Sequence, residues 1–211
     1  MDREWRDSYT LTVTASDLGS PQQNTSVQLN ITVNDVNDNR PMFNSSSLQG
    51  VILENSPAGS TVMRIIATDA DTGMNAQLEF NFTTTEYLDV FSLNSSTGEV
   101  TALKPLDREK QDRYTLKISV RDHGEPRLSS LADFTINVID VDDNCPKFQP
   151  AVYNKNISEN LPFNQSIIQV TATDVDLKDN EMISYSISSG NQAGAFTIDR
   201  HGKDIFLNIF G

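Results

Sequence analysis

The sequence predicts an all-β protein made of tandem Greek-key β-sandwiches of seven strands each. Two observations lead to this prediction: the 211-residue chain repeats its own motifs at a spacing of 105 residues, and apolar residues alternate with polar ones inside each repeat. A unit of about 105 residues with seven short strands has the size of a Greek-key sandwich. The length is enough for one large domain or two small ones.

The repeat is visible in five motifs, each of which recurs at the same offset. The pairs are Asp2–Glu4 with Asp107–Glu109, Tyr9–Val13 with Tyr114–Ile118, Asp35–Pro41 with Asp140–Pro146, Glu54–Pro57 with Glu159–Pro162, and Ala67–Asp71 with Ala172–Asp176. One fixed offset across five separate motifs indicates an internal repeat, and a fixed period of this kind decides the architecture of a chain.

Strands are predicted where apolar residues occupy every second position, because successive side chains of a strand point to opposite faces. The alternating series are Tyr9–Ala15, Val27–Val33, Leu78–Phe82, Tyr114–Val120 and Phe134–Val138. Turn residues such as Gly19-Ser20-Pro21 separate the series. No long stretch has a helical period, so each series is expected to form a strand with one buried face.

The frame of the repeat divides the chain into one complete repeat and two partial ones. Residues 1–40 are expected to be the C-terminal part of one repeat, residues 41–144 a complete repeat, and residues 145–211 the N-terminal part of a third. A partial sandwich is expected to leave strand edges and half of a core uncovered.

Charge and composition exclude several classes of protein. The formal net charge is −13 and the pI is about 4.4, which argues against nucleic acid and anionic membranes as partners because both attract clustered Lys and Arg. The same excess of negative charge favours cations as partners. A single Cys excludes a disulfide framework and a cysteine-based zinc cluster. No catalytic motif is present, so neither an enzyme nor a small-molecule substrate is predicted.

N-glycosylation sequons indicate the secretory pathway. Seven Asn-x-Ser/Thr motifs occur, where this composition gives roughly three or four by chance. They begin at Asn24, Asn30, Asn44, Asn81, Asn94, Asn156 and Asn164. The first residues lack the apolar segment of a signal peptide, and no apolar run is long enough to span a membrane. We therefore expect a fragment of a glycosylated secretory-pathway protein.

The recurring motifs are rich in carboxylates, and the five pairs hold 15 of the 29 Asp and Glu residues. Two carboxylates 4 Å apart repel one another by roughly 1 to 4 kcal/mol, so a cluster of them favours a bound cation. The donors are oxygens of Asp, Glu, Asn and backbone carbonyls, which suit a hard cation and calcium above magnesium or zinc. Solvation explains any single Asp at a strand end, but it does not explain a set that recurs.

This combination of motifs resembles the extracellular repeat of the cadherin superfamily over essentially the whole chain. The resemblance rests on Asp-Arg-Glu, on Asp-x-Asn-Asp-Asn-x-Pro-x-Phe at Asp35–Phe43, on Glu54-Asn55 and on Asp69-Ala70-Asp71. Leu106–Glu109 and Asp69–Ala76 look closer to the protocadherin, Fat and Dachsous branches than to strand-swapping cadherins. Membership of this family implies calcium ions at each junction between repeats.

The resemblance implies two sets of calcium ligands. Around residue 40 they are Asp2, Glu4, the Val36 and Asn39 carbonyls, Asn37, Asp38, Asp69, Asp71, the Asn75 carbonyl and Asp122. Around residue 145 they are Glu54, Asp107, Glu109, the Val141 and Asn144 carbonyls, Asp142, Asp143, Asp174, Asp176 and the Asn180 carbonyl. Asp35 and Asp140 match the motif but are not expected to be direct ligands. Asp142 replaces the usual linker Asn and adds a negative charge.

For function, the resemblance implies calcium-dependent cell adhesion by the extracellular part of a plasma-membrane protein that is anchored outside this fragment. Calcium at the junctions would stiffen an extracellular rod that presents homophilic or heterophilic surfaces to cadherin-type ectodomains on a neighbouring cell. A non-adhesive spacer segment of a large cell-surface receptor is the alternative, and the sequence does not separate the two.

Overall fold

The computed structural model describes residues 1–45, 48–176, 182–200 and 204–207. In these ranges the regular secondary structure consists of strands, which confirms the predicted all-β class. No helix among the described residues is long and apolar enough to cross a membrane. The chain forms two compact units: unit 1 comprises Met1–Leu106 with Gln111–Val138, and unit 2 comprises Asp107–Lys110 with Ile139–Gly211. The boundaries of the three predicted repeats stay a prediction.

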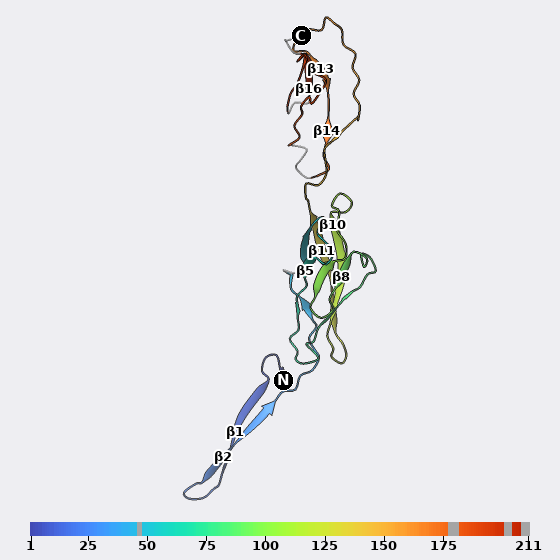
Figure 1. The fold of residues 1–211 in the computed structure, drawn as a ribbon. Coiled ribbons are helices and arrows are strands. Elements are labelled where there is room, and N and C mark those ends of the chain that lie inside the picture. Colours follow the sequence, from blue (N-terminus) through green and yellow to red (C-terminus); the bar gives the residue numbers. More distant parts are fainter. Residues whose placement is uncertain (46–47, 177–181, 201–203, 208–211) are drawn as a thin grey trace. The chain divides into compact units, whose positions relative to one another are not determined.

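Unit 1 begins with a two-stranded antiparallel hairpin of β1 (Ser8–Ser16) and β2 (Asn24–Thr32), drawn in blue in Figure 1. The register pairs Leu11 with Leu29 and Val13 with Val27, so these apolar side chains share one face of the hairpin. All four are exposed among the described residues. The alternating pattern therefore predicted these two strands correctly.

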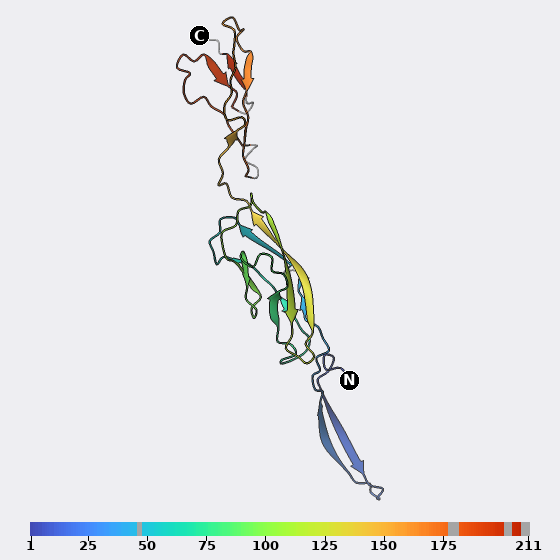
Figure 2. The same ribbon diagram turned by 90° about the vertical axis from the view of Figure 1, so that its right-hand side faces the viewer.

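The rest of unit 1 is a sandwich whose strands lie in two layers (Figure 2). One sheet has the order β4 (Gln49–Leu53), β11 (Ser129–Ile139), β10 (Arg113–Arg121) and β7 (Glu79–Phe82). The other has the order β5 (Thr61–Arg64), β9 (Glu99–Ala102) and β8 (Phe91–Leu93). A short pair, β3 (Met42–Phe43) and β6 (Ala67–Thr68), completes it.

The core of the sandwich is built by the alternating residues of β10 and β11. Leu116, Ile118, Phe134 and Ile136 are almost completely buried between the sheets. The Phe43 ring packs edge-on against Phe134, with 5.3 Å between ring centroids. Each of these side chains contributes about 1.5 to 3 kcal/mol by leaving water, so the core fixes where the strands end and the polar loops begin.

The described residues of unit 2 form two small sheets. One pairs β12 (Lys147–Phe148) with β14 (Ala172–Thr173), and the other has the order β13 (Ser166–Gln169), β16 (Asp204–Leu207) and β15 (Phe196–Ile198). The buried apolar cluster among its described residues consists of Val170, Ala172 and Tyr185. This core is much smaller than that of unit 1.

Candidate metal centres

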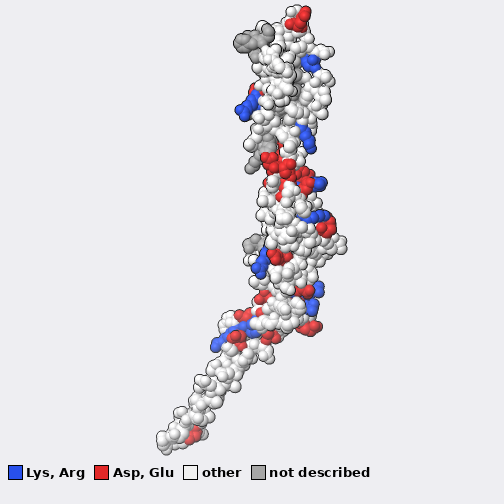
Figure 3. All heavy atoms as spheres, in the orientation of Figure 1, with Lys and Arg blue, Asp and Glu red and all other residues white. Residues whose placement is uncertain are grey.

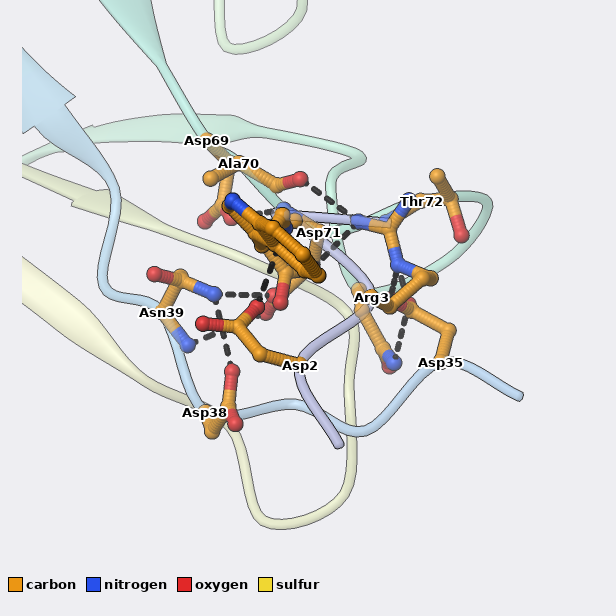
Figure 4. A network of polar contacts seen from close by, with 12 residues as sticks. Asp2, Arg3, Asp35, Asp38, Asn39, Asp69, Ala70, Asp71 and Thr72 are labelled. Atoms are coloured by element: carbon orange, nitrogen blue, oxygen red, sulfur yellow. Dashed lines mark hydrogen bonds and ion pairs between the residues drawn. The ribbon is translucent and has the colours of Figure 1, made fainter. Parts of the chain in front are cut away.

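Three segments of unit 1 that are distant in sequence converge on one polar group (Figure 4). They are the turn that carries Asp2–Glu4, the extended segment Asp35–Asn39 after β2, and the loop Asp69–Thr72 after β6. The turn is closed by the Arg6 N–H, which donates to the Asp2 carbonyl at 3.0 Å.

Asp71 lies at the centre of this group, and its side chain is only 5% exposed. The Asn39 backbone N–H donates to Asp71 Oδ2 at 3.2 Å, and the Asn39 amide Nδ2 donates to Oδ1 at 2.6 Å. The Asp71 N–H in turn donates to Asp69 Oδ1 at 3.0 Å. Glu4, Asp38 and Asp71 each place one carboxylate oxygen within 4.8 Å of the others.

Asp69 lies among like charges in this group. Burial raises the pKa of the Asp69 carboxyl above its usual value, and the neighbouring carboxylates of Asp71 and Asp122 raise it further. The second oxygen of Asp69, Oδ2, is buried and has no hydrogen-bond partner. A buried carboxylate oxygen without a donor is costly, so this position suits a cation.

Asp122 extends the group from the loop that follows β10. Its buried carboxylate accepts hydrogen bonds from the N–H groups of Gly124 and Leu128 at 3.0 to 3.1 Å. The Asn37 amide Nδ2 donates to Asp122 at 3.2 Å and to the Pro126 carbonyl at 2.6 Å. The Asn37 amide oxygen is then left buried without a hydrogen-bond partner, which provides a second oxygen suited to a metal.

Unit 2 contains a group of the same construction. Glu109, Asp143 and Asp176 place one carboxylate oxygen each within 4.8 Å of one another. The Asn144 backbone N–H and amide donate to Asp176 at 2.9 and 2.8 Å, and the Asp176 N–H donates to Asp174 Oδ1 at 3.1 Å. Burial opposes ionisation of Asp176, but the donors from Asn144 and Asp143 outweigh it and lower the pKa of that carboxyl.

An arginine holds together the segments of each group. The sequence did not lead us to expect a role for either arginine. Arg3 pairs with Asp35 and donates to the Ala70 carbonyl at 2.6 Å. Arg108 pairs with Asp140 at 2.5 Å and donates to the carbonyl of residue 175 at 2.8 Å. Each Arg also pairs with the glutamate that follows it in the chain. The signal was available, because the Arg of the Asp-Arg-Glu motif recurs at the same offset of 105 residues.

Several other predicted ligands lie close to these groups. Asn75 donates from its side chain to Asp35 Oδ2 at 2.9 Å. Asp107 pairs with Lys110 at 2.7 Å, and this partner lowers the pKa of the Asp107 carboxyl. Asp174 is buried in unit 2 and Glu54 is buried at the end of β4 in unit 1.

The remaining predicted sites can be placed individually. Val36 and Asp142 are exposed, Val141 is half-buried, and Asn180 lies outside the described residues. All seven sequon asparagines are exposed, so each has room for a glycan; they are Asn24, Asn30, Asn44, Asn81, Asn94, Asn156 and Asn164. Their glycosylation stays a prediction.

The donor chemistry of both groups suits a hard divalent cation. Every side chain that forms them offers oxygen, from Asp, Glu or Asn, and their geometry brings three carboxylates together in each case. Oxygen-only sets of this kind favour calcium over the transition metals, which prefer nitrogen and sulfur. Two unpartnered buried oxygens in the first group agree with such an ion.

Comparison with known proteins gives consistent matches. The sequence model of the Cadherin domain matches residues 48–139 and 153–209. Cadherin EGF LAG seven-pass G-type receptor 3 of Homo sapiens is 40% identical over 203 residues, which are 96% of this chain and 6% of that protein. The Protocadherin-like wing polarity protein stan of Drosophila melanogaster is 37% identical over 198 residues, 94% of this chain and 6% of that protein. The chain thus spans about 6% of the length of these relatives.

Solved structures agree with the sequence matches. The extracellular cadherin domains 3–6 of Protocadherin Gamma B2 superpose with a TM-score of 0.86 at 26% identity, covering 100% of this chain and 53% of that one. Mouse Cadherin-23 EC22-24 superposes with a TM-score of 0.74 at 32% identity, covering 99% of this chain and 66% of that one.

Fold and sites together define a class of protein, the repeated β-sandwich module with oxygen-rich groups at its strand ends. The chain belongs to the cadherin domain family. This confirms the predicted resemblance, including its closeness to the protocadherin and Fat branches, since Protocadherin Fat 4 of Homo sapiens is 35% identical over 204 residues, 96% of this chain and 4% of that protein. The chain is an extracellular segment of the cadherin type. The relatives named here are receptors and cadherins rather than enzymes.

Proposed function

We propose that the chain is a calcium-binding segment of extracellular repeats in a cell-adhesion receptor. The observation that carries this proposal is the pair of buried, unpartnered oxygens, Asn37 Oδ1 and Asp69 Oδ2, beside the carboxylates of the first group. Burial, together with the carboxylates of Asp71 and Asp122, also raises the pKa of Asp69. Bound calcium would supply the positive charge that these oxygens lack.

The residues of the first group come from two parts of unit 1. Some lie in the chain before β1 and after β2, and the others lie in two loops of the sandwich. Glu4 and Asp38 come from the hairpin side, whereas Asp71 and Asp122 come from the sandwich loops. Ligands from separate segments are held together when they share an ion, so the base of the hairpin becomes stiffer. In unit 2, Glu109, Asp143 and Asp176 unite three segments in the same way.

Affinity is expected to be in the range of extracellular calcium modules, about 10⁻⁴ to 10⁻³ M. Calcium at 100 times its Kd would raise the free energy of unfolding by about 2.7 kcal/mol per site. Thermal unfolding with increasing calcium tests this directly. Asp71→Asn and Asp176→Asn should each reduce the calcium-dependent rise in Tm. The control is Asp89→Asn, because Asp89 lies outside both groups and pairs with Lys104.

A wild-type chain whose Tm does not change between calcium and a chelator would contradict the proposal. A rise that magnesium reproduces at the same concentration would identify a less selective divalent site and would also contradict calcium as the specific ligand.

The adhesive role is proposed for the parent protein, with other cadherin-type ectodomains on a neighbouring cell as partners. The support is the family and the extracellular setting of its members. Beads that carry the parent ectodomain, with and without residues 1–211, test this role in an aggregation assay with calcium. Loss of aggregation without the segment would support adhesion. If beads with and without the segment aggregate equally well, the segment is a spacer.

A further inference from the structure

The short ladder of β3 and β6 in unit 1 has one face in the core and the other in solvent. Phe43 and Ala67 lie opposite one another and pack against the buried core. Because successive side chains of a strand alternate between its faces, Met42 and Ile66 point outward, and they are 71% and 46% exposed. The outer face of this ladder therefore presents two apolar side chains to water.

Asn44 belongs to the same outer face and lies directly opposite Ile66. The register that pairs Met42 with Thr68 continues along the ladder. The Asn44 N–H donates to the Ile66 carbonyl at 2.9 Å. Opposite side chains of a ladder have Cβ atoms about 5 Å apart, and side chains two residues apart along one strand are about 7 Å apart. Asn44 is exposed and begins an Asn-Ser-Ser sequon, so a group attached to it lies within reach of both apolar side chains.

The equivalent ladder of unit 2 carries polar residues on its outer face. β12 and β14 pair in the same register, and the Gln149 N–H donates to the Thr171 carbonyl at 2.9 Å. The residues 105 positions after Met42 and Ile66 are Lys147 and Thr171. Polar side chains are what a water-facing surface ordinarily carries. In unit 1 the same positions are apolar, and the residue beside both of them begins a sequon, which Gln149 does not.

The outer face in unit 1 is also uncharged, which narrows the choice of occupant. Its residues Met42, Asn44, Ile66 and Thr68 are all neutral. Charged side chains gather in clusters on the surface drawn in Figure 3, with uncharged stretches between them. A charged partner would find no complementary group on this face, whereas a neutral sugar needs none. A sugar ring also has a face of C–H groups that can leave water against aliphatic side chains.

We propose that an N-linked glycan on Asn44 covers the outer face formed by Met42 and Ile66. Its first sugar, an N-acetylglucosamine, packs against both side chains. Because the glycan is attached covalently beside the face, its effective concentration there is high and no second molecule has to be recruited. In the attachment step, Nδ2 of Asn44 bonds to C1 of the sugar and loses a proton. The bond from C1 to a lipid-linked pyrophosphate donor breaks, and the lipid pyrophosphate leaves.

Covering this face stabilises the ladder that leads to the first group of candidate metal ligands. β3 and β6 have two residues each, and a ladder this short has little stability of its own. β6 ends at Thr68, and Asp69 follows directly. A glycan that protects the ladder therefore also steadies the loop that carries Asp69 and Asp71, whether or not calcium is bound.

Methionine oxidation by dilute hydrogen peroxide tests the proposal on the secreted chain, in a chelator so that calcium binding has no part in the result. Peptide mass spectrometry measures the occupancy of Asn44 and the oxidation rates of Met42 and Met74. Met74 is 58% exposed in the loop after β6 and serves as the internal reference. Relative to Met74, Met42 should oxidise at about half the rate seen in Asn44→Gln, or more slowly still, because oxidation follows exposure.

Asn81→Gln is the matched control, because Asn81 is another exposed sequon residue of the sandwich and lies opposite the polar Ser119 of β10. This substitution should leave the Met42 rate unchanged. An unmodified Asn44 would overturn the proposal, and so would equal Met42 rates in the parent chain and in Asn44→Gln. Protection of Met42 that appears only as the protein concentration rises would identify a second copy as the occupant and would also overturn it.

Thermal unfolding in a chelator tests whether the glycan stabilises the chain through Ile66. Asn44→Gln should lower the Tm of the secreted chain by about 2 to 4 °C. The same substitution in chain made in bacteria, without the glycan, measures the effect of the amide change alone. Ile66→Thr introduces the residue type that unit 2 carries at Thr171, and it should remove most of the glycan-dependent difference. A difference that persists in full in Ile66→Thr would show that the glycan acts elsewhere and would overturn the proposal.

Discussion

Arg3 and Arg108 each hold an aspartate of an extended segment and a backbone carbonyl of the loop that carries a buried aspartate. Each guanidinium thereby joins three segments that are distant in sequence. Because the fork of an arginine offers several donors in a fixed geometry, it can set the spacing of the carboxylates before any ion binds. The arginines are positioning residues rather than ligands.

Arg108→Gln should destabilise unit 2 when calcium is absent. The change leaves the half-buried Asp140 carboxylate without its cationic partner, and the loss is expected to be about 1 to 3 kcal/mol. Thermal unfolding in a chelator measures it. Arg127→Gln is the control, since Arg127 is exposed in the loop before β11. Equal Tm values for the two variants would contradict the bracing role.

Gly124→Ala should weaken calcium binding by the first group. A Cβ at this position would collide with the Asn37 amide and approach the Asn75 side chain. The Asn37 amide would then lose its bonds to Asp122 and the Pro126 carbonyl. We expect about a tenfold loss of affinity, measured by calorimetry. Asn37→Ala should produce a similar loss, and the double variant should lose little more than either single one. Full additivity would show that Gly124 acts elsewhere.

Asp89 should have a lower pKa than an ordinary Asp because it pairs with Lys104. The ammonium lies 2.6 Å from the carboxylate and lowers the pKa of Asp89 in the folded protein. A lowered folded-state pKa means that the pair contributes stability above the unfolded pKa, and that this contribution is lost as pH falls through the folded value. Carboxyl NMR titration checks this. Lys104→Met should return the Asp89 pKa to its ordinary range, and no change on that substitution would contradict the pairing.

At the scale of elements, the turn between β8 and β9 depends on Gly98. Its φ is +69°, and an added Cβ would collide with the Ile65 carbonyl oxygen. Gly59 also has a positive φ, of +90°, but no atom lies within 4 Å of a Cβ built there. Gly59→Ala should therefore cost about 1 to 2 kcal/mol from backbone strain alone, and Gly98→Ala more. Denaturant unfolding of unit 1 compares them, and equal losses would contradict the collision.

Strands were predictable where a segment has both an alternating apolar pattern and a neighbouring strand to pair with. The alternation of Tyr114–Val120 gave β10 correctly, because this strand finds neighbours on both sides. Ser184–Ile187 alternates in a similar way but is not assigned to a strand, and the described residues offer it no ladder partner. Periodicity reports the face a residue prefers, whereas a ladder also needs a partner that is distant in sequence.

The metal groups were predictable to a similar extent. The motif positions Glu4, Asp38 and Asp71 do come together, as the resemblance implied. The contact of Arg3 with Asp35 was not foreseen, because a motif identifies which residues recur and not which neighbours they touch. The unpartnered state of single oxygens depends on the complete fold and was beyond any reading of the sequence.

For the whole molecule, the net charge of −13 and the clustering of carboxylates at motif positions mean that stability depends on the ionic conditions. Without a cation, carboxylates that lie within 4.8 Å of one another repel, and the segments that carry them are held mainly by the arginine braces and the asparagine hydrogen bonds. With calcium the same segments become cross-linked by shared coordination.

Pulsed electron spin resonance between the hairpin and the sandwich of unit 1 measures whether calcium stiffens the base of the hairpin. Spin labels at Thr12→Cys in β1 and Asp133→Cys in β11, in a Cys145→Ser background and diluted into unlabelled chain, report one distance distribution. If calcium joins these segments, the distance distribution should be narrow in calcium and broad in a chelator. In the Asp71→Asn variant it should be broad in both. Distributions of equal width in calcium and chelator would contradict it.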